Sequence, residues 1–173
     1  MLYVRKFSKL TSLEKIKTLS NAFEIDSDFL HQELRTSSNT LSFWECENMD
    51  CLEDTIKTIL LSMTSIETSQ FIIIDESILK DHKIEIDRTS LGKTGYKDHA
   101  HLHVDLCNLT YSKIGDIIKI LKSVATHKDN TPKYEKNKVK DIIRQLYNDN
   151  LIDLEATNDH LRKDITKYYS KST

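Results

Sequence analysis

Hydrophobic residues recur along much of this chain at the 3.6-residue spacing of a helix that buries one face. One stripe follows Asn48 and predicts a helix capped by that residue; its members are Leu52, Ile56, Ile59, Leu60, Met63 and Ile66. A second stripe follows the polar residues 108–110 and consists of Ile114, Ile117, Ile118, Leu121 and Val124. Gly115 lies inside this second helix, where it costs about 1 kcal/mol relative to Ala or marks a close contact.

Further helices are predicted near both ends of the chain. Thr131 and Pro132 indicate a helix start, because Thr can cap a helix and Pro is tolerated at the first helical position. The helix that follows has Val139, Ile142, Ile143, Leu146 and Tyr147 on one face. Thr157 is expected to cap a last helix with Leu161, Ile165 and Tyr168 inward. Shorter helices are expected over residues 12–23, with Leu13, Ile16, Leu19 and Phe23, and over residues 27–34.

Four segments have the patterns of β-strands. Residues 41–46 include Phe43 and Trp44, and residues 70–74 form a continuous apolar run typical of a strand covered on both faces. Ile84 and Ile86 alternate with charged residues in 83–87. Residues 99–106 alternate regularly, which predicts one polar face with period two; it consists of His99, His101, His103 and Asp105.

These elements predict an α+β fold, with a small mixed sheet of about four strands within residues 41–106 and helices packed on it. Helices after residue 130 form a C-terminal helical extension. We therefore expect an α+β domain over residues 1–130 and the extension over residues 131–173.

Composition narrows the class of protein. The 173 residues are 38% hydrophobic and 30% charged with a net charge of −2, which excludes a disordered chain. No apolar run is long enough to span a bilayer, and the start lacks the features of a signal peptide. Three cysteines without a Cys-x-x-Cys motif favour free thiols in a reducing cytoplasm. We expect a cytoplasmic protein without a membrane contact or a cofactor.

Abundant Ile, Lys and Asn with only three Gly and one Pro indicate an AT-rich or mobile genetic element.

The predicted histidine strand is the sharpest candidate for chemistry. Two imidazoles at positions i and i+2 of a strand can reach one metal ion, so His101 and His103 are candidate ligands. Three histidines on one strand would span about 13 Å, too far for all to bind one ion. A third ligand would have to come from Asp81, His82 or Glu85. An exposed polar sheet face or a protein-binding face explains the same pattern without metal.

Two further groups of residues are candidates for binding. Basic residues cluster at the start of the extension, as in surfaces that contact phosphates; they are Lys133, Lys136, Lys138, Lys140 and Arg144. A solvated helix face or a surface for an acidic partner would have the same composition. Tyr168 and Tyr169 are candidate partner-binding residues, because aromatic side chains are favoured anchors at interfaces.

Four segments together resemble a family of small accessory proteins of bacterial defence islands: Leu41–Trp44, Phe71–Asp75, Gly92-Lys93-Thr94-Gly95 and His103–Leu106. The family is the middle component of three-component systems with an SMC-like ATPase, such as Lamassu. The resemblance implies a non-catalytic subunit that bridges the ATPase and an effector nuclease in an antiviral complex. The alternative is a small metal-dependent or RNA-cleaving toxin-like enzyme that uses the face of His99, His101 and His103.

Overall fold

A computed structural model of the chain describes residues 1–21 and 24–169 and has an α+β fold. Within these residues, six strands form one open sheet in the order β4-β5-β2-β1-β3-β6, and every neighbouring pair is antiparallel. The strands are β1 (Leu2–Lys6), β2 (Leu41–Cys46), β3 (Ser69–Asp75), β4 (Glu85–Asp87), β5 (His103–Cys107) and β6 (Lys133–Tyr134).

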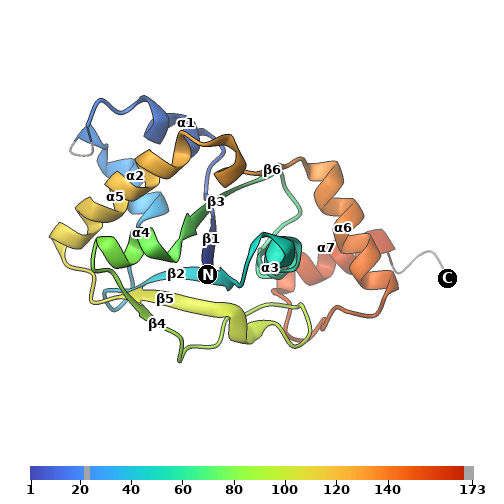
Figure 1. Ribbon diagram of the computed structural model, residues 1–173. Coiled ribbons are helices and arrows are strands. Elements are labelled where there is room, and N and C mark those ends of the chain that lie inside the picture. The colour runs from blue at the N-terminus through green and yellow to red at the C-terminus, as the bar shows by residue number, and fades with distance from the viewer. Residues whose placement is uncertain (22–23, 170–173) are drawn as a thin grey trace.

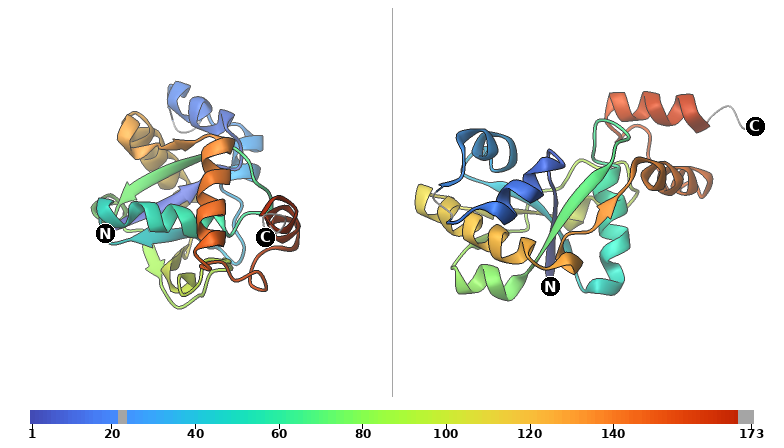
Figure 2. Two further views of the ribbon diagram at one scale, coloured as in Figure 1. Left: turned by 90° about the vertical axis from the view of Figure 1, so that its right-hand side faces the viewer. Right: turned by 90° about the horizontal axis from the view of Figure 1, so that it is seen from above.

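Helices cover both faces of the sheet (Figure 1). One face carries α1 (Thr11–Thr18), α2 (Ser27–Glu33), α4 (Glu76–Asp81) and α5 (Tyr111–Ala125). The other carries α3 (Leu52–Leu60), α6 (Lys136–Asn148) and α7 (Asp159–Tyr169). Figure 2 shows α6 and α7 side by side at one end of the molecule.

Strand alternation divides the interior into two cores. Tyr3 on β1 and its partner Ile74 on β3 face the core beneath α5. Val4 and its partner Ile73 face the core beneath α3 and α6. All four side chains are buried because a strand in the middle of a sheet covered on both faces has no solvent side.

The predicted α+β class is confirmed, but the predicted sheet differs in two ways. It has six antiparallel strands rather than four in a mixed sheet, and it extends from residue 2 to residue 134. The missed strand β1 lies at the centre, between β2 and β3. Its apolar residues, Leu2, Tyr3 and Val4, are too few to define a period on their own.

The predicted helix start at Thr131-Pro132 is wrong. Main-chain carbonyls of these two residues accept hydrogen bonds from Gln70, and the Pro132 carbonyl also accepts from the Phe71 amide. The segment therefore leads into edge strand β6, where a residue without an N–H is tolerated. Because β6 pairs with β3, strand pairing crosses the boundary between residues 1–130 and 131–173, and that division stays a prediction.

Several predicted helix starts are confirmed by the caps. Asn48 caps a 3₁₀ turn (Met49–Cys51) that leads into α3, accepting hydrogen bonds from the amides of residues 50 and 51, and Thr110 caps α5. Helix α7 is capped instead by Asn158, whose side chain accepts from the His160 amide. The helix expected over residues 12–23 ends at Thr18, and Phe23 lies outside the described residues.

No helix in the described part of the chain combines the length and the apolarity needed to cross a membrane.

Candidate functional site

The predicted strand of three histidines is wrong, because the strand begins only at His103. Residues Ala100–Leu102 form a 3₁₀ helix, and β5 follows directly at His103. Leu102 packs in the core beneath α3, whereas Val104 and Leu106 pack in the core beneath α5. The perfect alternation of residues 99–106 is therefore interrupted at its midpoint, and the three imidazoles do not share a sheet face.

Each of the three histidines has surroundings of its own. The His99 ring stacks on Tyr96, with 3.9 Å between ring centroids, and its Nδ1 lies 2.5 Å from the Lys97 carbonyl. His101 is exposed, and its ring lies 6.4 Å from that of His99. Among residues 1–21 and 24–169, no group of three or more His, Cys, Asp or Glu side chains is arranged to hold a metal ion.

His103 belongs to a small polar cluster with Ser90 and Asp105. The Ser90 hydroxyl donates to Asp105 Oδ2 at 2.8 Å and lies 2.9 Å from His103 Nδ1. The His103 ring also meets the Trp44 ring edge to face at 5.3 Å. In a Ser-His-Asp triad the imidazole lies between serine and carboxylate, whereas here the serine lies between the other two. The cluster therefore fixes the loop before His103 to the sheet rather than activating the serine.

Two side chains of β1 have shifted pKa values, and both hold neighbouring segments of the fold together. Burial lowers the pKa of Arg5 to about 10, and its guanidinium donates to the main-chain carbonyls of Ser42 and Glu33. Burial raises the pKa of Tyr3, whose hydroxyl accepts from Arg88 and donates to Glu76. These bonds join β1 to segments on either side of it.

The glycines of the Gly92-Lys93-Thr94-Gly95 segment are required by close packing. A Cβ atom on Gly92 would lie 2.3 Å from Trp44 Cη2, and one on Gly95 would lie 2.0 Å from Thr157 Oγ1. The segment lines a polar pocket of about 620 Å³ together with residues 155–159 before and at the start of α7. Its glycines thus allow this connecting segment to pack closely against Trp44 and Thr157.

The predicted basic and aromatic residues meet in a groove between α6 and α7. This α6–α7 groove has a volume of about 400 Å³ and is lined by Asn137, Lys140, Asp141, Arg144, Tyr168 and Tyr169. The Tyr169 hydroxyl donates to the Lys140 carbonyl at 3.0 Å, and burial raises the pKa of Tyr169. Arg144 pairs with Asp141 at 2.8 Å, with both side chains largely exposed.

The remaining basic candidates lie outside the α6–α7 groove. Lys133 lies on β6 and pairs with Glu135 at 2.8 Å. The Lys138 ammonium lies 4.1 Å from the ring centroid of Tyr134, and Lys136 is exposed at the first position of α6. Only Lys140 and Arg144 of the five predicted residues share a site with the two tyrosines.

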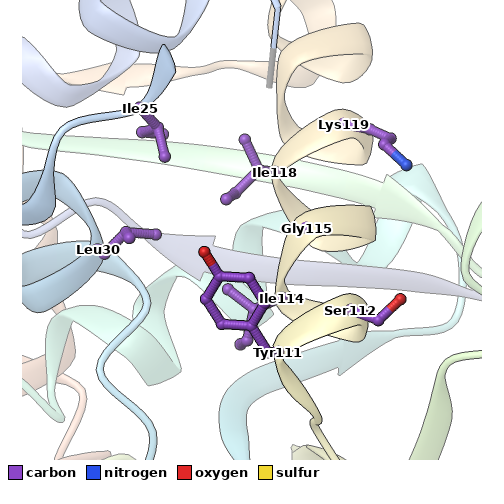
Figure 3. Close-up of a pocket in the computed structure, with 8 residues that line it drawn as sticks. All are labelled: Ile25, Leu30, Tyr111, Ser112, Ile114, Gly115, Ile118 and Lys119. Atoms are coloured by element: carbon purple, nitrogen blue, oxygen red, sulfur yellow. The ribbon is translucent and has the colours of Figure 1, made fainter. Parts of the chain in front are cut away.

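A second groove, which the sequence did not predict, lies between α2 and α5 (Figure 3). This α2–α5 groove has a volume of about 350 Å³ and is lined by Ile25, Leu30, Tyr111, Ser112, Ile114, Gly115, Ile118 and Lys119. Tyr111 is 92% exposed. A Cβ atom on Gly115 would meet no atom of residues 1–21 and 24–169 within 4 Å, so the close contact that the sequence offered as one explanation of this glycine is not found among them.

Sequence could have hinted at this groove only through two residues. Tyr111 precedes the apolar stripe of α5, and Gly115 interrupts a helix that otherwise favours large side chains. Neither residue indicates which element lies opposite α5, and that element, α2, comes from a segment about 80 residues earlier in the chain.

Comparisons of the chain with protein-family models, with curated proteins and with solved structures find no match.

Proposed function

We propose that this protein is a non-catalytic accessory subunit that bridges an ATPase and an effector in a bacterial antiviral defence complex. The observation that carries the proposal is the α2–α5 groove, which is lined by the exposed Tyr111 and by the partly buried side chains of Ile25, Leu30 and Ile114. Exposed apolar surface of this kind is typical of sites that bind other proteins. The resemblance to defence accessory proteins and the AT-rich composition support the class of complex.

The surroundings of Gly115 support the proposal that a partner protein binds in the α2–α5 groove. Glycine in the interior of a helix costs about 1 kcal/mol relative to Ala. No atom of the described residues requires its small size, since a Cβ atom there would meet none of them within 4 Å. An apolar segment of a partner protein could approach the α5 backbone closely at this point, on the side of α5 where Tyr111 and Leu30 lie.

A bridging subunit also needs a second surface that remains accessible when the first is occupied. The α6–α7 groove lies toward the opposite end of the molecule from α2 and α5 (Figures 1 and 2). The two grooves share no lining residue. An occupant of one groove would therefore leave the other free.

Co-expression with the products of neighbouring genes tests the proposal. The ATPase would be tagged and this protein would carry either Gly115→Lys or the matched control Ser123→Lys, at an exposed position of α5 outside the groove. Gly115→Lys places a long charged side chain at the groove, and its Cβ atom meets no described atom within 4 Å, so we expect a folded protein whose capture falls at least about tenfold, equivalent to 1.4 kcal/mol. Capture of the Ser123→Lys variant should equal that of the wild type.

Two results would contradict the proposal. Equal capture of both variants would exclude the α2–α5 groove as the docking site. Growth arrest on expression of this protein alone, with recovery when His101 and His103 are both replaced by Ala, would favour the toxin-like enzyme.

A further inference from the structure

Helices α6 and α7 concentrate positive charge in an otherwise acidic protein. Together they carry seven Lys or Arg and three Asp, which leaves 18 of the 25 basic residues and 24 of the 27 acidic residues for the rest of the chain. General attraction of a polyanion to the whole protein is therefore small. A polyanion that binds must bind locally, at these two helices.

Tyr168 places an accessible aromatic ring within this positive region. The ring is flanked by two ammonium groups, with Lys140 Nζ at 5.2 Å and Lys167 Nζ at 5.7 Å from its centroid. Tyr168 is 46% exposed, and the neighbouring Tyr169 is fixed by its hydrogen bond to the Lys140 carbonyl. Cations from both helices thus converge on an aromatic ring that is about half exposed.

A shallow basic site continues this surface along α7. Arg162, Lys163 and Lys167 line it. Arg162 pairs with Asp159 across one helical turn, as Arg144 does with Asp141. Ion pairs between exposed side chains contribute little to stability, so a phosphate can replace either carboxylate at small cost.

We propose that the α6–α7 groove binds single-stranded nucleic acid, with an unpaired base stacked on Tyr168 and backbone phosphates at Lys140, Lys167 and Arg144. Aromatic platforms between basic side chains are the usual means of binding single strands without sequence preference. A duplex keeps its bases stacked inside and offers Tyr168 no base face. An acidic polypeptide would use the charges and gain little from the ring. Such binding adds nucleic acid to the proposed protein partners and does not depend on the α2–α5 groove.

Fluorescence anisotropy with labelled oligonucleotides tests this site in the full-length protein. The probes are oligo(U) and oligo(dT) of about 20 nucleotides, long enough for one site of this kind, and a duplex of equal length. We expect both single strands to bind more tightly than the duplex. Because binding releases counterions, replacing Lys140 and Lys167 by Gln should reduce the slope of log K against log salt by about 0.7 for each phosphate that the variant no longer neutralises.

Three tyrosine variants separate stacking from general charge. Tyr168→Ala should weaken single-strand binding by roughly 5- to 100-fold, the fold-change that corresponds to loss of one stacked base. Tyr168→Phe keeps the ring and should bind like the wild type. Tyr111→Ala, which removes an even more exposed tyrosine from α5, should also bind like the wild type.

The proposal is overturned if no single strand binds, if Tyr168→Ala binds as tightly as the wild type, or if the duplex binds as well as the single strands. Competition by poly-glutamate at the same charge concentration would instead identify an acidic polypeptide as the ligand. Circular dichroism of each variant would show that weaker binding does not reflect unfolding.

Discussion

Glycines in the segment from Gly92 to His103 and on the outer face of α5 have opposite surroundings. At Gly92 and Gly95 the space that a side chain would need is filled by Trp44 and Thr157. At Gly115 that space is empty and borders an apolar groove. The first two glycines are packed against their own chain, whereas a side chain at Gly115 would meet no described atom. A glycine in a sequence therefore does not reveal whether its missing side chain serves internal packing or an external contact.

The largest effect on stability is expected for Gly92→Ala. Its new Cβ would lie 2.3 Å from Trp44 and 2.7 Å from His103 Cβ, and neither group can move without disturbing the β2–β5 pair. Inserting an atom into such a packed site destabilises a protein by about 1–3 kcal/mol. Urea unfolding followed by circular dichroism measures the change, and unchanged stability would show that this segment is not closely packed.

His103→Ala should destabilise the protein by about 1–2 kcal/mol, because it removes one hydrogen bond to Ser90 and the aromatic packing against Trp44. His101→Ala is the matched control, because that side chain is exposed and we expect a change within about 0.5 kcal/mol. Thermal melting with and without a chelator adds a second criterion. A fall in melting temperature with chelator that is abolished by His101→Ala would contradict separate roles for the two histidines.

Gly115→Ala should act in the opposite direction to Gly92→Ala. The new methyl group meets no atom within 4 Å, and Ala is the more favourable residue inside a helix. Stabilisation of up to about 1 kcal/mol is expected. If Gly115→Ala destabilises the protein, then the space above α5 is not open and the contrast between the two segments fails.

Tyr111→Ala should change stability least. With 92% of its surface exposed, the side chain contributes little to the core, and a change within about 0.5 kcal/mol is expected. Capture by a partner in the α2–α5 groove should nevertheless fall, because exposed aromatic residues often dominate interfaces. Loss of stability without loss of capture would assign Tyr111 to the fold.

The sequence predicted correctly those elements that are determined by residues close together in the chain. Residues 41–46 form β2 as predicted, and four residues of the predicted α5 stripe are buried: Ile117, Ile118, Leu121 and Val124. Strand β1 was missed because its place at the centre of the sheet depends on pairing with β2 and β3, far along the chain. Residues 99–102 have the alternation of a strand, yet the main chain turns there, and the Ala100 carbonyl accepts from the Gly92 amide.

The binding surfaces were predictable only in part for the same reason. Lys140, Arg144, Tyr168 and Tyr169 were identified as separate candidates, but their meeting in one groove depends on the packing of α7 against α6. The α2–α5 groove was not predicted, since nothing local pairs Leu30 with Gly115. Composition can select the residues of a site, whereas their assembly depends on tertiary contacts.

Amide hydrogen exchange of this protein, alone and mixed with the ATPase of the proposed complex, tests the central claim most directly. The account predicts slower exchange in the partner complex at the start of α5, around Tyr111–Lys119, and in residues 25–30, because the partner covers the α2–α5 groove. Gly92 and Gly95 should exchange at the same rate in both states, since both are packed against their own chain and lie outside the groove. Unchanged exchange in α5, with protection elsewhere, would contradict the account.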